Sequence, residues 1–209
     1  MTSEKMWIVV EDEKILAVSS HQIEDGFDVE FEELEYDLAA YRYVEDKILY
    51  DFNAHLDFVK MLKEQELSDA SDESIRAGFE FEISPDNLAI IPFDETGQKN
   101  LQATIQLFEK GIIHSIPWTV NRIGGSADRV ILTAEMSEGI ALSAMLHTHV
   151  NISRFRDQLM PIVKSATTIE DVENVTWDDS NVNFRGFPTV YECKNFLENK
   201  KIDIGDLKL

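Results

Sequence analysis

The first fifty residues alternate between apolar and polar side chains over short stretches. Between Phe27 and Phe31 every second residue is apolar and the two residues between them are acidic, which is the period of a strand that is buried on one face. Polar turns separate this stretch from its neighbours, so strands are predicted at 7–10, 15–19, 27–31, 41–44 and 47–50. Short strands joined by tight turns pair antiparallel. Residues 1–52 are therefore predicted to form a small antiparallel β module.

A helical pattern follows this module. Asn53 suits the N-cap position, and residues 54–76 then carry apolar side chains at helical spacing. The second half of this stretch keeps only a thin apolar stripe of Leu67, Ala70 and Ile75, which is too narrow to fill a large core. A thin stripe is typical of a connector between modules, or of a seam where identical helices pack in an oligomer. Because the stripe covers fewer than three heptads, residues 53–77 are predicted to be a connector helix, with the seam as the alternative.

Residues 78–177 mix the two periods. Strands are predicted at 79–83, 88–93, 116–122 and 128–133, with helices at 96–110, from Thr133 onwards, and at 169–175. Thr133 and Thr168 are the expected N-caps, Pro161 is expected to kink or interrupt the long helix, and Trp177 is expected to close the core. The predicted buried stripe of the long helix is Leu142, Met145, Leu146, His149, Ile152 and Phe155. The predicted fold class is α+β, with a C-terminal domain (78–177) of short hairpins packed on helices.

The composition changes after Trp177. Residues 178–188 are polar and rich in turn formers, with neither period sustained. Residues 189–199 have the spacing of an amphipathic helix, with an apolar side made of Val190, Cys193, Phe196 and Leu197. We treat 178–209 as a C-terminal extension.

The charge is strongly acidic. The 209 residues hold 40 Asp and Glu against 19 Lys and Arg, a formal net charge of −21. Such a field repels nucleic-acid phosphates and anionic membrane surfaces, so we expect neither direct nucleic-acid binding nor membrane insertion. The apolar runs are also too short to span a bilayer, and the N-terminal residues lack the pattern of a secretion signal. The single cysteine, Cys193, cannot form an internal disulfide. We expect a protein that is made in the cytoplasm and is soluble there.

Catalytic and cofactor motifs are not evident. Gly124-Gly125 lacks the Lys and Ser/Thr that follow in a phosphate-binding loop, and predicts a hairpin turn instead. His147 and His149 are two residues apart, so on a helix they point about 200° from each other and would not share one metal ion. The tryptophans are better explained as core anchors than as platforms for sugars. We therefore expect no enzymatic activity, no bound metal and no cofactor.

One succession of features carries a resemblance. Its members are Trp118-Thr119 at a strand, the turn Gly124-Gly125, Leu132-Thr133 at the next strand, His147 within a long helix, a polar turn at 154–157 with two arginines, and the Ala-Thr-Thr…Trp close at 166–177. This succession resembles a domain of unknown function in tail-region proteins of bacteriophages and prophages, and the likeness extends over residues 6–177. Its motifs are structural. The resemblance therefore implies a fold and a place of action, and it assigns no catalytic residue.

The resemblance implies a non-enzymatic structural or adaptor protein of a phage tail or baseplate, made in the cytoplasm of the host bacterium and located in the tail region of the virion. Its partners would be other tail or baseplate proteins, and a homo-oligomer would most simply be a trimer. The candidate interface residues are Tyr41, Tyr43, Tyr50, Leu67, Ala70 and Ile75. Tyrosine suits interfaces, although each of the three tyrosines also fits a cross-strand pair within its hairpin.

Two alternatives remain open. The net charge also suits an acidic, phage-encoded inhibitor that mimics nucleic acid and occupies a host defence or regulatory protein. A tail-fibre assembly chaperone would share the fold of the structural protein.

Overall fold

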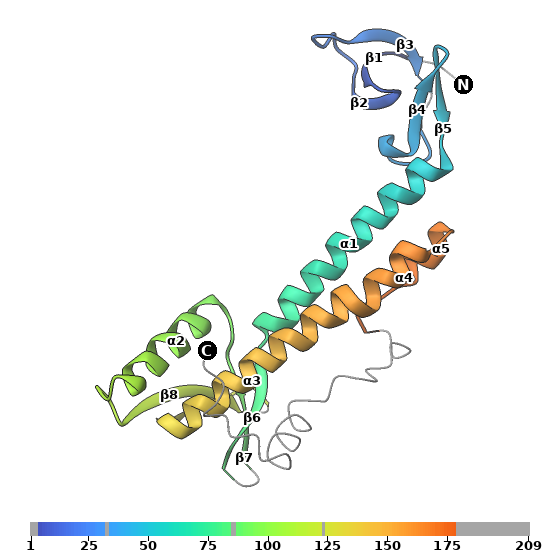
Figure 1. The fold of residues 1–209 in the computed structure, drawn as a ribbon. Helices are drawn as coiled ribbons and strands as arrows, with labels where there is room; N and C mark the ends of the chain where they lie inside the picture. Colours follow the sequence, from blue (N-terminus) through green and yellow to red (C-terminus); the bar gives the residue numbers. More distant parts are fainter. Residues whose placement is uncertain (1–3, 32–33, 85–86, 123, 179–209) are drawn as a thin grey trace. The chain divides into compact units, whose positions relative to one another are not determined.

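The computed structural model describes residues 4–31, 34–84, 87–122 and 124–178 (Figure 1). Its fold class is α+β, as predicted. By its internal contacts the described chain divides into two compact units. The first comprises the residues up to 66 together with 160–176, and the second comprises 67–159 with Trp177 and Asp178. The amphipathic helix predicted at 189–199 lies outside the described residues.

The first unit contains a five-stranded antiparallel sheet with the strand order β3-β1-β2-β4-β5 (Figure 1). The strands are β1 (Glu4–Glu11), β2 (Lys14–Ser19), β3 (Phe27–Phe31), β4 (Tyr41–Val44) and β5 (Lys47–Tyr50), and a short 3-10 helix, η1 (Leu38–Ala40), precedes β4. Two-residue turns join β1 to β2 and β4 to β5, and all four turn residues have positive φ, which matches the twist of paired strands. Ile8 of β1 and Ala40 of η1 are fully buried and belong to one hydrophobic cluster of this unit. The predicted N-terminal antiparallel sheet is confirmed.

Helix α1 (Phe52–Arg76) follows the sheet directly. Asp51 Oδ1 accepts the backbone N–H groups of Asn53 and Ala54 at 2.9 and 3.1 Å. Asp51 therefore satisfies the free N–H groups of the first turn, and the prediction of Asn53 as the N-cap is wrong. The N–H of Ala54 is the main cause that holds the pKa of Asp51 below its ordinary value, and the Arg42 guanidinium, 3.3 Å from Oδ2, adds to it.

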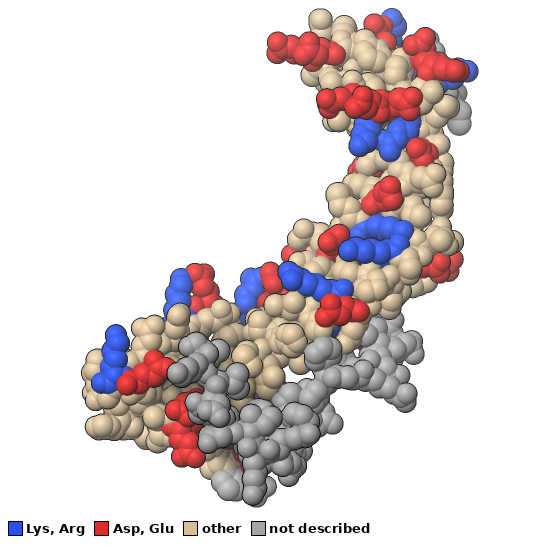
Figure 2. All heavy atoms as spheres, in the orientation of Figure 1, with Lys and Arg blue, Asp and Glu red and all other residues tan. Residues whose placement is uncertain are grey.

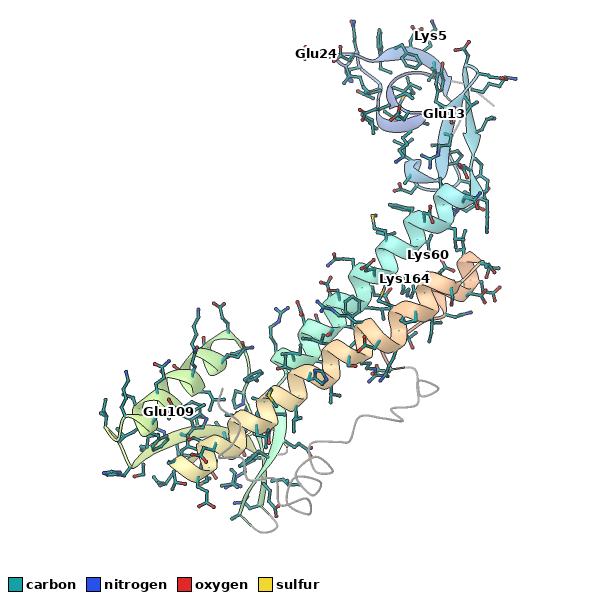
Figure 3. The ribbon with its side chains drawn as sticks, viewed as in Figure 1. Lys5, Glu13, Glu24, Lys60, Glu109 and Lys164 are labelled. Atoms are coloured by element: carbon teal, nitrogen blue, oxygen red, sulfur yellow. The ribbon has the colours of Figure 1, made fainter. Side chains whose placement is uncertain are left out.

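Two short helices from late in the chain belong to the first unit. They are α4 (Met160–Ser165) and α5 (Ile169–Glu173). Lys60 Nζ donates to the carbonyl oxygen of Lys164 at 3.1 Å, and Lys63 Nζ donates to that of Glu173 at 3.4 Å (Figure 3). Ammonium groups are favourable at the carbonyl ends of helices. The sequence division at residue 78 groups 160–176 with the second domain, whereas in the structure these residues return alongside α1.

The second unit is built on a four-stranded antiparallel sheet with the order β6-β7-β8-β9. Its strands are β6 (Phe79–Ser84), β7 (Asn87–Ile91), β8 (Ser115–Arg122) and β9 (Ala127–Thr133), and its helices are α2 (Glu95–Glu109) and α3 (Ala134–Ser153). Leu101 of α2 and Ile140 of α3 share one buried cluster with Val120 and Leu132 of the sheet. Both helices therefore cover the same face of this sheet.

The buried face of α3 differs from the predicted one. Ile140 and Ala144 are buried, whereas Met145 is 55% exposed and His149 is exposed as well, so the predicted stripe is wrong in its phase. Helix α3 approaches the sheet closely on the side that carries small residues. A Cβ at Gly139 would come within 3.2 Å of the Phe81 ring on β6. The helix is apolar over most of its circumference, so periodicity did not identify the face that meets the sheet.

The ends of α3 follow the expected local chemistry. Thr133 Oγ1 accepts the N–H of Met136 at 3.3 Å, which confirms this N-cap. After α3 the chain forms a π-helical segment, η2 (Arg154–Leu159), before α4. Pro161 has no N–H to continue an α-helical ladder, and the irregular turns lie directly before it. The interruption that the proline predicts is confirmed. None of the described helices combines the length and the hydropathy that a membrane crossing requires.

Candidate protein-contact sites

The surface of the β-sheet in the first unit is mostly acidic. Residues 1–50 hold 14 Asp and Glu against 4 Lys and Arg. Figure 2 shows carboxylate side chains gathered over this sheet on the face in view, with few basic side chains among them. A macromolecule that docks here would associate faster if the rim of its own contact surface were basic, because opposite potentials steer association.

Three aromatic rings lie together where β5 passes into α1. The ring centroid of Tyr36 is 5.3 Å from that of Tyr50 and 4.6 Å from that of His55. Tyr36 and Tyr50 are 42% and 45% exposed, whereas His55 is only 8% exposed. We call Tyr36, Tyr50 and His55 the aromatic cluster. The rings of Tyr36 and Tyr50 are exposed to solvent, and the buried ring of His55 packs against both of them.

The neighbours of the aromatic cluster hold it in place. Tyr41 Oη accepts the backbone N–H groups of Glu35 and Tyr36 at 3.1 and 3.3 Å, which fixes the backbone that carries the Tyr36 ring. The hydroxyl of Tyr50 lies 3.1 Å from His55 Nδ1. The charge of Glu35 is the main cause that raises the pKa of Tyr36 above its ordinary value, so this phenol stays neutral. The two exposed rings are therefore ordered before any partner arrives.

The three candidate tyrosines have different environments. Tyr41 is 8% exposed and belongs to the core of the sheet, so its role is packing. Tyr43 is half-buried and donates to Asp46 Oδ1 at 3.2 Å; burial is the main cause that raises its pKa. Tyr50 is the cross-strand partner of Tyr41, with ring centroids 5.9 Å apart, and it is also exposed. Tyr50 is the only one of the three that is both exposed and part of the aromatic cluster.

The predicted helix seam is occupied within the chain itself. Leu67 is fully buried, and Ala70 and Ile75 are half-buried. In the second unit, Ser71 Oγ on the same helix donates to the carbonyl oxygen of Asn151 at 3.3 Å. Helix α3 of the same unit therefore lies against this part of α1. The stripe predicted as a possible oligomer seam packs within one copy of the chain.

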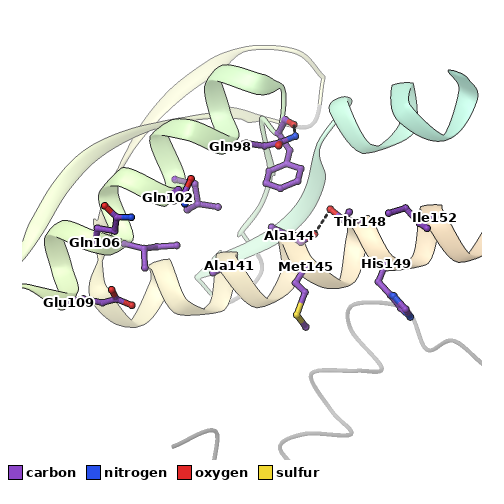
Figure 4. Close-up of a pocket in the computed structure, with 13 residues that line it drawn as sticks. Gln98, Gln102, Gln106, Glu109, Ala141, Ala144, Met145, Thr148, His149 and Ile152 are labelled. Atoms are coloured by element: carbon purple, nitrogen blue, oxygen red, sulfur yellow. Dashed lines mark hydrogen bonds between the residues drawn. The ribbon is translucent and has the colours of Figure 1, made fainter. Parts of the chain in front are cut away.

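A groove runs between α2 and α3 of the second unit, with a volume of about 660 Å³ (Figure 4). Its floor and walls are mainly apolar and include Leu101, Ile105, Ala141, Ala144 and Met145. Its rim is polar and consists of Gln98, Gln102, Gln106, Glu109, Thr148 and His149. We call this feature the α2–α3 groove. Narrow apolar grooves with polar rims are the usual seats of amphipathic helices.

Local features of both helices shape the α2–α3 groove. Asp94 Oδ1 accepts the N–H of Gly97 at 2.7 Å and caps α2. A Cβ at Gly97 would lie 2.5 Å from the carbonyl oxygen of Pro92, so only glycine lets α2 start this close to the end of β7. On α3, Thr148 Oγ1 donates to the carbonyl oxygen of Ala144 at 2.9 Å. That hydroxyl is satisfied within its own helix, which leaves its methyl group for the groove.

The two histidines of α3 have separate environments. His147 Nε2 lies 3.0 Å from the carbonyl oxygen of Ser74, and its ring is 5.5 Å from that of Phe79. His149 lines the α2–α3 groove instead (Figure 4). Among the described residues no three His, Cys, Asp or Glu side chains converge in a way that could hold a metal ion.

Sequence reasoning named Tyr50 of the aromatic cluster but missed the rest of that cluster and the whole α2–α3 groove. Tyr36 stands in a turn without a periodic pattern, and nothing local indicates that its ring meets His55 of α1. The α2–α3 groove had a weak signal in the four-residue spacing of Gln98, Gln102 and Gln106, which places a polar row along one side of a helix.

No protein-family model, curated protein or solved structure matches this chain.

Proposed function

We propose that the protein is a non-enzymatic component of a phage tail or baseplate that acts through protein–protein contacts. The observation that carries the contact role is the aromatic cluster, whose two exposed tyrosine rings are supported by His55 and by the hydrogen bonds to Tyr41 Oη. The phage location rests on the resemblance over residues 6–177.

The geometry of the aromatic cluster supports contact with a protein. Exposed tyrosines supply a large contact area with few rotatable bonds, so they lose little entropy on binding. Rings that are already ordered reduce this cost further. The acidic surface around the cluster favours a partner with an apolar recess and a basic rim. A neighbouring tail or baseplate subunit with such a surface is the proposed partner.

The virion location is tested by mass spectrometry of gradient-purified particles induced from the source strain. We expect peptides of this chain in the particle fraction at a constant ratio to known tail proteins. Detection only in the lysate would refute the structural role, and would favour the alternatives of an acidic inhibitor or an assembly chaperone.

The contact role is tested by replacing both exposed rings, as Tyr36→Ala and Tyr50→Ala together. We expect this double variant to fold and to be strongly depleted from particles, because exposed aromatic anchors dominate interface energies. Leu16→Ala is the matched control, since Leu16 lies in the same sheet and is 55% exposed. Equal incorporation of the double variant and the control would show that the aromatic cluster is not the contact site.

A further inference from the structure

The two exposed rings of the aromatic cluster form one surface. The ring centroids of Tyr36 and Tyr50 lie 5.3 Å apart, and the ring planes are inclined by 39°. A group stacked between two rings needs about 7 Å between them, because each stacking contact takes about 3.5 Å. No group fits between these rings, so an occupant would lie across their solvent-exposed side.

The orientation of this surface is fixed from within the first unit. Tyr41 and His55 are both 8% exposed, and each lies against the Tyr50 ring at a steep interplanar angle, 72° for Tyr41 and 82° for His55. The faces of aromatic rings carry the negative part of a quadrupole and attract cations. Exposed rings that are held in one orientation therefore make a preformed site for a positive charge.

A carboxylate lies beside the exposed rings. Glu35 is exposed, and its charge, followed by its hydrogen bond with the phenol, raises the pKa of Tyr36, so the two groups are neighbours. Asp37, on the other side of Tyr36 in the sequence, accepts the N–H of Ala39 at 3.0 Å and caps η1. Glu35 is therefore the carboxylate that a cation on the rings would meet.

The basic side chains of the neighbouring hairpin point away from this surface. Side chains alternate between the two faces of a strand pair, so Arg42 on β4 and Lys47 on β5 lie on the face opposite to Tyr50. Arg42 is also paired with Asp51, whose Oδ2 lies 3.3 Å from its Nε. Residues 34–41 hold two acidic residues and no basic one. A cation for the aromatic cluster would therefore come from a partner.

We infer that the aromatic cluster receives an arginine side chain of the partner protein, with the guanidinium stacked across the exposed rings of Tyr36 and Tyr50 and paired with the carboxylate of Glu35. The inference rests on the proposed contact role of the cluster and names the side chain that the cluster recognises. Arginine suits this site better than lysine, because the guanidinium is planar and weakly hydrated, stacks on aromatic rings and pairs with carboxylates through its fork of N–H groups.

The test uses the purified full-length protein with isotope-labelled tyrosine rings and three blocked tripeptides, Gly-Arg-Gly, Gly-Lys-Gly and Gly-citrulline-Gly. Citrulline has the shape of arginine without its charge. Nuclear magnetic resonance titrations follow the ring signals of Tyr36 and Tyr50, which single Tyr→Phe variants assign. We expect the arginine peptide to bind more tightly than the lysine peptide, and at least about fivefold more tightly than the citrulline peptide.

Three variants show which groups cause this preference. Tyr36→Leu keeps an apolar contact but removes a ring face, and Glu35→Gln removes the carboxylate. Each should weaken arginine binding by about two- to fivefold, measured at Tyr50, and leave citrulline binding unchanged. Glu24→Gln is the matched control, because it removes the same charge from the turn before β3, away from the start of α1 (Figure 3). Circular dichroism checks that all variants are folded.

Three results would overturn the inference. They are equal binding of the arginine and citrulline peptides, tighter binding of the lysine peptide, and equal effects of Glu35→Gln and Glu24→Gln. The last result would show that the acidic surface attracts cations without a local site.

Failure of this inference is distinguishable from failure of the contact role. Depletion of the double variant Tyr36→Ala and Tyr50→Ala from particles, without any preference for the arginine peptide, would overturn the inference and leave the contact role in place. A preference for arginine without such depletion would support the arginine site and refute its use in particles.

Discussion

Gly78, two residues after the end of α1, offers the sharpest test of how the second unit is packed. Its φ is +87°, a region that side chains other than glycine disfavour. A Cβ at this position would lie 2.2 Å from the carbonyl oxygen of Ile91 on β7. Because the clash is with backbone, no rotamer change relieves it. Gly78→Ala should therefore strain the junction between α1 and the sheet.

Gly111, which follows α2, separates the strain of a positive φ from the steric clash of an added Cβ. Its φ is +65°, yet a Cβ there would meet no atom within 4 Å. Gly111→Ala should therefore cost only the conformational penalty, about 1 to 2 kcal/mol. Gly78→Ala adds the forced backbone shift, about 1 to 3 kcal/mol more by comparison with overpacked cores. The expected total for Gly78→Ala is about 2 to 5 kcal/mol.

Urea unfolding followed by the fluorescence of Trp118 measures both variants. A background with Trp7→Phe and Trp177→Phe leaves Trp118 as the only tryptophan, and Trp118 packs against the core of the unit that contains both glycines. Equal destabilisation by the two variants would show that the contact with β7 contributes nothing. A Gly78→Ala variant as stable as the parent would refute the backbone argument altogether.

Three further changes test local interactions. Asp51→Asn should keep the cap of α1 but abolish a pH-dependent stabilisation. Because the pKa of Asp51 is lowered in the fold, its carboxylate stabilises the fold above the ordinary aspartate range, and this contribution is lost as the pH falls through the lowered pKa. Acid titrations of stability followed by circular dichroism should therefore differ between the variant and the parent. Ile140→Ala should cost about 2 to 5 kcal/mol because it leaves a cavity, whereas Ile131→Ala on β9, at a side chain that is 60% exposed, should cost far less; equal losses in urea unfolding would contradict the burial of Ile140. Thr133→Ala should cost about 1 kcal/mol through loss of the α3 cap, and Thr133→Ser should restore most of it in the same assay.

Local sequence signals identified most of the elements. The alternation at 27–31 predicts β3, and the threonine before the long apolar stretch predicts the cap of α3, because strand period and capping depend only on neighbouring residues. The cap of α1 shows the limit of such reasoning. Asp51 and Asn53 are both good capping residues, and the end of β5 at Tyr50 decides between them.

Both candidate sites depend on contacts that are distant in sequence. Tyr36 meets His55 across two strands and a turn, and α3 approaches α2 after an intervening hairpin. The phase of α3 was mispredicted because Leu142, Met145 and Leu146 are as apolar as Ile140, so hydropathy did not distinguish the faces. Gly139 and Ala144 set the buried side, since small residues allow the helix to approach the sheet closely.

The sequence by itself determined which stretches form strands and helices, the positions of most helix starts and breaks, and the acidic character of the chain. These properties follow from local periodicity, capping chemistry and composition. Only the tertiary structure decided that residues 160–176 return alongside α1, that the stripe of Leu67 packs within one copy, and which aromatic rings and grooves face solvent. Those outcomes depend on steric fit between segments as many as 110 residues apart, and no local pattern records that fit.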